Sequence, residues 1–353
     1  MSTINTISEL LTLSDSQYRI YDIGRVICKI SKNDFSKIEL NQLPYPFPSQ
    51  GNACVAIVFW QQKTAEPYIW FVKLPLDERG LLNQGSRNHF IGILVEALDL
   101  QQKNVQNNAV NLTLTPNEKQ EELLKNNPYH FTPAQYKLAS LNSIIKVELK
   151  QTPSQYFSHC HDYLSGKLGW DNWQNVAIQG LTDIAARLPK NNNEQILVNN
   201  FNKLPMQVLQ PLCGALENQT LSFDLLTEIR KKITQHNDNS LLQQHLLRAL
   251  ASSANKLPVQ TLIIELLAQD NLEDELLIVI SGRCWLALQD QTLLMQFLEK
   301  VVLAQDKYLF AAIFKDLIAI PNIRPILFTC MRQPERSPAL AKAIGQLFNQ
   351  VKA

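Results

Sequence analysis

The feature that most constrains the fold is a helix ending that recurs in the second half of the chain. Three apolar segments end in Ala-Leu followed by polar residues, and their alanines are Ala215, Ala249 and Ala287. The segments 178–189 and 310–321 show the same alternation of small and large apolar residues. An interval of about 30 to 40 residues accommodates two antiparallel helices, and one such pair cannot bury its apolar face alone. The spacing of the alanines falls in this range and therefore predicts helical pairs that stack on one another.

Helix start signals support this interpretation. Thr-Pro pairs occur at 115–116, 132–133 and 152–153. Each offers a hydroxyl suited to an N-cap before a proline suited to the first helical position. The segment 274–288 is apolar on nearly every face, so a helix there needs neighbours on both sides. We expect an irregular α-solenoid of HEAT-like repeats, and an ordinary globular helical domain is the alternative.

The first part of the chain has a different pattern. β-branched and aromatic residues cluster in the runs 18–30, 53–61 and 68–74, which predict strands. The last two runs are separated by a short linker that suits an antiparallel hairpin. Three prolines place the segment 43–51 in a loop. An apolar run over 86–100, which opens with a serine suited to an N-cap, predicts a helix buried nearly all round.

These patterns predict an α+β chain of two domains. Residues 1–110 form a small module with antiparallel strands and one buried helix, and residues 111–353 form a larger all-α, irregular helical-repeat domain. The polar segment 101–110 is the candidate linker between them. The length of 353 residues agrees with two domains of roughly 150 residues each.

Composition bounds the partners and the compartment. The chain has 33 basic and 32 acidic residues, so its net charge of +1 gives no bulk attraction to nucleic acid or to a membrane surface. Its one compact basic cluster, 229–237, is too short to neutralise the roughly half-dozen phosphates of an ordinary nucleic-acid site. The six cysteines lie in apolar runs, which is typical of reduced, buried thiols. With no signal-peptide pattern and no long apolar run, we expect a cytoplasmic protein that does not bind membranes.

One segment has the residue types of a metal site. His159, Cys160, His161 and Asp162 are consecutive, but neighbouring residues on a helix point in different directions and cannot converge on one ion. The apolar stripe of this helix includes Cys160, which predicts a core position for the thiol. Two further ligands from elsewhere would be required for a zinc site. Nucleotide-binding motifs such as Gly-x-Gly-x-x-Gly are absent from the sequence, and we expect neither a metal nor a cofactor.

A second candidate motif follows the last predicted strand. Leu76, Asp77, Glu78 and Arg79 come directly after Pro75 and form the candidate binding motif. Adjacent carboxylates could act as acid and base, but the proline ends the strand and Gly80 can take a left-handed conformation, which favours a turn or an ion pair between domains. The Leu-Asp-Glu triplet after an aromatic strand resembles a family of functionally uncharacterised bacterial proteins, a domain of unknown function. This resemblance implies no activity, cofactor or partner.

Three function classes follow from these observations. The first is a non-enzymatic interaction or scaffold protein whose helical-repeat surface binds another protein. The second is an enzyme with a site in a groove between the two halves, around Asp77 and Glu78, although no residue is assigned a catalytic role. The third is nucleic-acid binding by the helical array, against which the charge balance argues. The sequence leaves the oligomeric state open.

Overall fold

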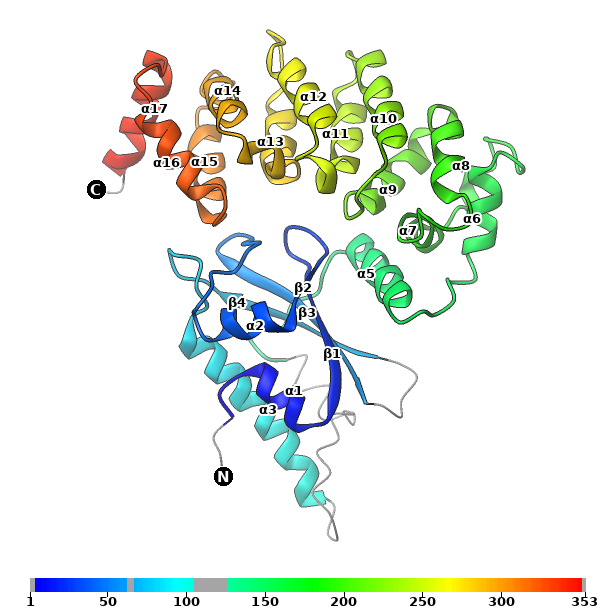
Figure 1. Cartoon of the computed structure of the whole chain (residues 1–353), viewed down its shortest axis with the longest axis vertical. Coiled ribbons are helices and arrows are strands. Elements are labelled where there is room, and N and C mark those ends of the chain that lie inside the picture. Colours follow the sequence, from blue (N-terminus) through cyan, green and yellow to red (C-terminus); the bar gives the residue numbers. More distant parts are fainter. Residues whose placement is uncertain (1–3, 62–66, 105–125, 351–353) are drawn as a thin grey trace. The chain divides into compact units, whose positions relative to one another are not determined.

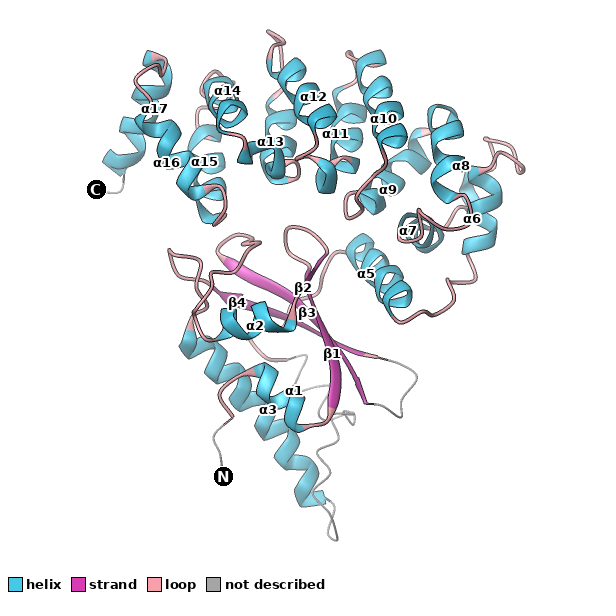
Figure 2. Ribbon diagram, in the orientation of Figure 1, coloured by secondary structure: helices cyan, strands magenta, loops and turns pink. Residues whose placement is uncertain are grey.

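The computed structural model of the protein describes residues 4–61, 67–104 and 126–350 (Figure 1). These residues form a four-stranded antiparallel sheet near the amino terminus and sixteen α-helices (Figure 2), which confirms the predicted combination of a small sheet and a mainly helical remainder. The chain divides into two compact units. The N-terminal unit comprises Met1–Pro133 and Ala319–Pro321, and the helical unit comprises Ala134–Ile318 and Asn322–Ala353. The boundary predicted after residue 110 and the helix start predicted at 115–116 fall outside the described residues.

The sheet of the N-terminal unit is built from two hairpins. Its strands are β1 (Ser16–Asp22), β2 (Cys28–Ile30), β3 (Asn52–Gln61) and β4 (Tyr68–Pro75), in the order β2-β1-β3-β4. The predicted hairpin is confirmed, with Val55 of β3 opposite Val72 of β4. The apolar run 18–30 contains two strands, because Asp22 accepts hydrogen bonds from the backbone N–H groups of Arg25 and Val26 and turns the chain.

Three helices complete this unit: α1 (Ile7–Leu13), α2 (Lys32–Glu39) and α3 (Gln84–Asn104). Only α3 corresponds to a predicted helix. α1 begins with a capping box, in which the hydroxyl of Thr6 accepts from the N–H of Glu9 and the carboxylate of Glu9 accepts from the N–H of Thr6. α1 and α2 have 7 and 8 residues, and about two turns are too few to show a clear helical period.

The prediction for α3 is wrong in two details. The helix begins before Ser86, whose N–H donates to the side chain of Asn83, so Asn83 and not Ser86 caps this end. Burial is one-sided, because Gly92 and Glu96 are exposed. The α3 side chains that join the core of the N-terminal unit are Phe90, Ile91 and Leu94. They pack with one face of the sheet, to which α1 and α2 also contribute apolar residues.

A buried glutamate connects the three helices of this unit. Glu39, at the end of α2, accepts hydrogen bonds from the backbone N–H groups of Ile7 (2.6 Å) and Ser8 (3.1 Å) at the start of α1. Its backbone carbonyl accepts from the guanidinium of Arg87 on α3. The first N–H groups of α1, which have no partner within that helix, are thereby satisfied.

The helical unit contains thirteen α-helices among its described residues. They are α5 (Gln135–Glu148), α6 (Phe157–Leu164), α7 (Ile178–Ala185), α8 (Asn193–Asn200), α9 (Met206–Leu216), α10 (Phe223–Gln235), α11 (Ser240–Ala249), α12 (Leu257–Leu267), α13 (Asp274–Gly282), α14 (Gln291–Val301), α15 (Leu309–Ala319), α16 (Arg324–Arg332) and α17 (Pro338–Gln350). From α7 to α12, each helix contacts the helix two places further along the chain, and so does α14. α7, α9, α11 and α13 make one series, and α8, α10, α12, α14 and α16 make another. We call the series that begins with α7 the first row and the series that begins with α8 the second row. Figure 1 shows α9, α11 and α13 of the first row beside α10, α12 and α14 of the second.

The three segments with Ala-Leu endings belong to α9, α11 and the 3-10 helix η4 (Trp285–Gln289), and the two with alternating small and large apolar residues belong to α7 and α15. Of these, α7, α9 and α11 are helices of the first row. The interval from Ala249 to Ala287 is longer than the one from Ala215 to Ala249, and the difference has a structural cause. Ala287 belongs to η4, which comes after α13 has already ended, and not to the end of an α-helix.

Buried positions in the second row recur at equal intervals. The first such set is Leu225, Val259, Leu293 and Leu327, on α10, α12, α14 and α16, with side chains at most 2% exposed. The second set, one helical turn later, is Ile229, Ile263, Phe297 and Met331, of which Met331 is the most exposed at 9%. Because the same interval separates all equivalent positions, α10, α12, α14 and α16 present the same face to the interior of the unit.

Two predicted N-caps in the helical unit are wrong. α5 has Ala134 as its N-cap instead of Thr132, and α6 begins five residues after Thr152. In the second case the carboxylate of Asp183 accepts from the backbone N–H of Ser154 at 2.8 Å. This hydrogen bond holds the chain before α6 against α7, in a conformation that is not helical.

The segment 274–288 is also not one helix buried on every face. α13 ends at Gly282, and η4 follows after a break. Ile278, in the middle of α13, is 51% exposed. The buried apolar residues of α13 are Leu276, Leu277 and Ile280. The helix is therefore covered on one side only.

Candidate functional site

The candidate motif at residues 76–79 belongs to a tight turn between β4 and α3. Leu76 and Leu82 form an isolated antiparallel bridge across it. Gly80 has a φ of +82°, the left-handed conformation that the sequence predicts. One carboxylate oxygen of Asp77 accepts hydrogen bonds from the backbone N–H groups of Arg79 (2.9 Å) and Leu81 (2.8 Å). The Asp77 side chain thus closes the turn.

The ion pair of Asp77 is local to the same turn. Its second carboxylate oxygen lies 3.2 Å from the guanidinium of Arg79. The sequence favours a turn or an ion pair between domains, and this ion pair lies within the turn. The hydrogen bond from the Leu81 amide, with those from Arg79, lowers the pKa of Asp77. Glu78 is exposed. Both oxygens of Asp77 serve the turn, an arrangement that supports a structural role more than acid–base chemistry.

The segment with consecutive metal-ligand types forms α6. Cys160 is fully buried, as the helical geometry predicts, and burial raises the pKa of its thiol to about 11. Asp162 pairs with Lys167 at 2.8 Å on the surface. Cys160 faces α7, where Gly180 leaves room for it. In the chain described by the structure, no group of three His, Cys, Asp or Glu side chains is placed to hold a metal ion.

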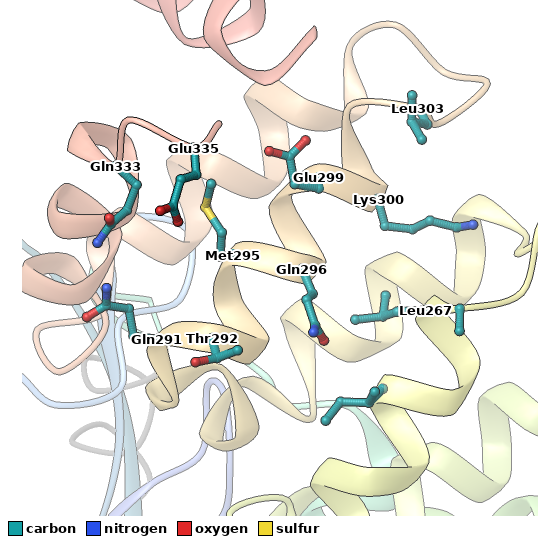
Figure 3. A pocket seen from close by; sticks show the side chains of 12 residues that line it. Leu267, Gln291, Thr292, Met295, Gln296, Glu299, Lys300, Leu303, Gln333 and Glu335 are labelled. Carbon is teal, nitrogen blue, oxygen red and sulfur yellow. The ribbon is translucent and has the colours of Figure 1, made fainter. Parts of the chain in front are cut away.

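A groove of about 730 Å³ lies on the second row of helices and is the candidate functional site (Figure 3). Its walls are the carboxyl-terminal end of α12, one face of α14 and the loop between α16 and α17. The lining residues are Ile264, Leu267, Ala268, Gln291, Thr292, Met295, Gln296, Glu299, Lys300, Leu303, Gln333 and Glu335. The volume lies within the range of clefts that bind ligands in proteins.

Two charged side chains of the groove are held by structural partners. Glu299 accepts hydrogen bonds from the backbone N–H (2.9 Å) and the hydroxyl of Ser337, and the Ser337 hydroxyl in turn caps α17 at Leu340. Lys300 donates to the backbone carbonyl of Gln269, at the end of α12. Both side chains fix the walls of the groove.

The remaining polar side chains are available to a ligand. Gln291, Thr292 and Gln296 are exposed on α14. Thr292 and Gln296 are four residues apart, about one turn, and therefore lie on the same face of the helix. Glu335 is exposed in the loop after α16. Figure 3 shows its carboxylate on the same side of the groove as Gln333 and Met295.

Apolar side chains complete the walls. Leu303 is 69% exposed and Ile264 is 43% exposed, whereas Leu267 lies deeper at 8%. Met295 of α14 is half-buried. Leu303 and Ile264 are both exposed and both line the groove, so an apolar group of a ligand could contact them there.

Sequence reasoning did not single out any residue of this groove. A signal was available, because α14 buries Leu293, Leu294 and Phe297 and leaves polar residues on its opposite face. That pattern predicts an amphipathic helix, but it does not predict that α12 and the loop after α16 rise on either side of the polar face.

Comparisons with known proteins complete this description. A family model described as "Protein of unknown function (DUF3549)" matches residues 2–348. No curated protein and no solved structure matches the chain. Over residues 4–61, 67–104 and 126–350, none of the helices has the length and apolar character required to span a bilayer.

Proposed function

The chain belongs to the DUF3549 family of proteins of unknown function, and from this premise we propose that it is a non-enzymatic interaction protein that binds another protein through its helical unit. In this proposal the helical unit is an irregular, HEAT-like α-solenoid and the groove beside α14 is its binding site. The N-terminal unit is a separate small module.

The contacts within the helical unit support the solenoid. Each helix of a row contacts the next helix of the same row, and α10 also contacts α11 of the other row. Contacts of this kind, between successive pairs, are the defining feature of a repeat array. The regular recurrence of buried residues in α10, α12, α14 and α16 gives each pair an equivalent core.

Hydrogen bonds between successive pairs support it further. Lys232 of α10 donates to the carbonyl of Asn202 at 3.2 Å, and Lys300 of α14 donates to the carbonyl of Gln269. The number of residues from Lys232 to Lys300 is twice the number from Leu225 to Val259, so the two lysines occupy equivalent positions on α10 and α14. The carboxylate of Glu194 accepts from the N–H of Ser222 at 2.9 Å. Such bonds tie each pair to the one before it.

Two ion pairs, one buried and one half-buried, also serve the packing. Asp183 of α7 and Arg187, just beyond the end of that helix, pair at 2.9 Å with both side chains at most 5% exposed, and Asp183 accepts from Ser143 of α5 as well. Arg248 pairs with Glu217, at the ends of α11 and α9, and lies over the ring of Tyr136. These strongly charged groups are satisfied by structural partners, so they do not require a substrate.

The observation that carries the proposal is the composition of the groove. Its deepest charged residues hold the walls together, and the side chains left to a partner are amides, a hydroxyl, one carboxylate and exposed apolar groups. Such residues bind through shape and hydrogen bonding. Surfaces of this kind on helical arrays suit a polypeptide partner.

Site-specific photo-crosslinking of the full-length protein in its native cells tests the proposal. A photoreactive phenylalanine replaces Leu303 in the groove, and in a control protein it replaces Ile278, which is also exposed but lies on α13 in the other row. We expect one reproducible crosslinked protein from the Leu303 position and not from the Ile278 position. The same set of crosslinks from both positions, or none from Leu303, would contradict binding at the groove.

A further inference from the structure

We infer that the groove binds an extended peptide segment of its partner, in which a lysine or arginine stands beside apolar residues. This inference rests on the proposed function and specifies the chemistry of the partner. It follows from the length of the groove, the spacing of its amides, its apolar wall and its one available charge.

The length of the groove suits a chain. Its lining on α14 and just beyond runs from Gln291 to Leu303, which corresponds to about 18 Å at 1.5 Å per helical residue. An extended peptide rises about 3.3 Å per residue, so five or six residues cover this distance. The lining residues follow α14 over this length, so an extended chain can contact them at both ends, which a compact small molecule cannot.

The spacing of the polar side chains suits a peptide backbone. Thr292 and Gln296 are one turn apart, about 6 Å along the helix axis. Peptide units that face the same way in an extended chain repeat about every 6.6 Å, which is two residues. A glutamine amide both donates and accepts, so Gln296 can bond the C=O and the N–H of a partner backbone. Gln333, in the facing loop, offers the same groups from the other wall.

The apolar wall gives the peptide side chains a place to bind. Side chains of an extended peptide alternate between two faces. One set can rest on Leu303 and Ile264, which are both exposed, with Leu267 beneath them. Met295 has an unbranched, adaptable side chain that tolerates apolar groups of different shape.

The one charged side chain available in the groove determines the sign of the charge expected on the partner. Of the three charged lining residues, Glu299 and Lys300 bond to Ser337 and Gln269, which leaves the exposed carboxylate of Glu335. Arg336 follows Glu335 in sequence but is not among the lining residues, and its Nε atom is buried. A lysine or arginine of the peptide is therefore the complementary group.

A library of random dodecapeptides displayed on phage tests the inference with the full-length protein. Enriched sequences are synthesised, and their affinities are measured by fluorescence polarisation. We expect the enriched peptides to contain lysine or arginine next to leucine, isoleucine, valine or methionine. Their binding should be about five- to tenfold weaker to the Glu335→Gln variant, which loses one charge-assisted hydrogen bond.

Two further variants locate the binding. Gln296→Ala should weaken the same peptides about threefold or more, because it removes the backbone contact at the centre of the groove. Glu275→Gln alters an exposed carboxylate on α13, away from the groove lining, and should leave the affinity unchanged. Glu335→Gln and Gln296→Ala change exposed side chains, so circular dichroism should show the wild-type fold for both.

Each outcome decides the matter. Enriched peptides without basic residues, peptides that bind Glu335→Gln as tightly as wild type, or no enrichment at all would each overturn the inference. These results are distinct from a failure of the proposed function. If a protein is crosslinked at Leu303 but no basic peptide is enriched, the proposed interaction role stands and the inference of an extended basic segment is wrong. If basic peptides are enriched but no protein is crosslinked at Leu303, the proposed binding of a cellular protein at the groove is wrong.

Discussion

At the scale of single residues, the close packing of α6 against α7 depends on a glycine. A Cβ atom at Gly180 of α7 would lie 2.3 Å from Sγ of Cys160 and 2.8 Å from the carbonyl oxygen of Tyr156. α6 and α7 can therefore meet at this distance only because residue 180 has no side chain. The contact also explains why Cys160 is a core residue, although it stands between two histidines in the sequence.

Gly180→Ala should destabilise the protein by about 1–3 kcal/mol, because an extra methyl group in a closely packed core forces neighbouring atoms to move. Chemical denaturation monitored by circular dichroism measures the change. Gly345→Ala is the matched control, since no atom lies within 4 Å of its added Cβ atom on α17. The control should be stabilising by about 0.5–1 kcal/mol, because alanine favours the helix. Equal denaturation midpoints for Gly180→Ala and wild type would contradict the packing argument.

Asp77 should contribute to stability as a turn residue. Asp77→Ala should lower the free energy of unfolding by about 0.5–1 kcal/mol at neutral pH, near the low end for a lost capping side chain. The hydrogen bond from Leu81 and the interactions with Arg79 lower the pKa of Asp77 in the folded protein. Its contribution is therefore present above the ordinary carboxyl pKa and lost as the pH falls through the lowered pKa.

Denaturation of wild type and Asp77→Ala over a series of acidic pH values tests this sign. The difference between the two proteins should shrink towards low pH. Glu78→Ala, at an exposed neighbouring carboxylate, should stay within about 0.5 kcal/mol of wild type. A more stable Asp77→Ala protein would instead indicate a carboxylate kept at the expense of stability, which is typical of functional sites.

At the scale of helices, the junction between α12 and α14 is braced by Lys300. Its ammonium group donates to the carbonyl of Gln269, which lies beyond the end of α12 and has no partner within that helix. The equivalent contact from Lys232 to Asn202 braces α10 against the end of α8. Each brace joins two helices of the same row.

Lys300→Met should keep the aliphatic stem and lose the brace. We expect a loss of about 1 kcal/mol in the free energy of unfolding, the typical net contribution of one hydrogen bond. Amide hydrogen exchange should become faster at the end of α12 and along α14. Lys342→Met on α17, where the lysine is exposed, is the matched control and should change stability by less than about 0.5 kcal/mol. Unchanged exchange in α12 would show that the contact contributes nothing.

The elements that the sequence predicted best are those with a long or repeated pattern. The hairpin of β3 and β4 and the segments of α7, α9 and α11 follow from alternation or from spacing, which are properties of many residues together. α1 and α2 are too short to show a period. Thr132 and Thr152 look like N-caps, but tertiary contacts decide where a helix begins, as the bond from Ser154 to Asp183 shows.

The groove was beyond the reach of the sequence for a related reason. Its walls come from α12, α14 and the loop after α16, and residues from these separate parts of the sequence meet there only after the helices stack. The apolar surroundings of the cysteines in the sequence indicated burial, and five of the six are buried, with Cys28 as the half-buried exception. A concave surface requires the relative placement of helices, which no local pattern encodes.

At the scale of the whole molecule, the division into two compact units predicts that the helical unit can fold by itself. A fragment of residues 134–353 should give a strongly helical far-ultraviolet circular dichroism spectrum, because the described strands all lie in the N-terminal unit. The fragment should also unfold cooperatively on heating. A spectrum with substantial sheet, or one without a thermal transition, would contradict the division.

The regular recurrence of buried positions along α10, α12, α14 and α16 bears on how such a chain can change in evolution. If a segment as long as the interval between equivalent buried positions were duplicated or deleted, each buried position would still face its usual neighbour. Only the length of the surface would change. One residue inserted within α12 would rotate every later position of that helix by about 100° and bring polar groups into the core. Homologues of different length should therefore differ by whole intervals of this kind in this region, and single-residue insertions should be confined to the loops.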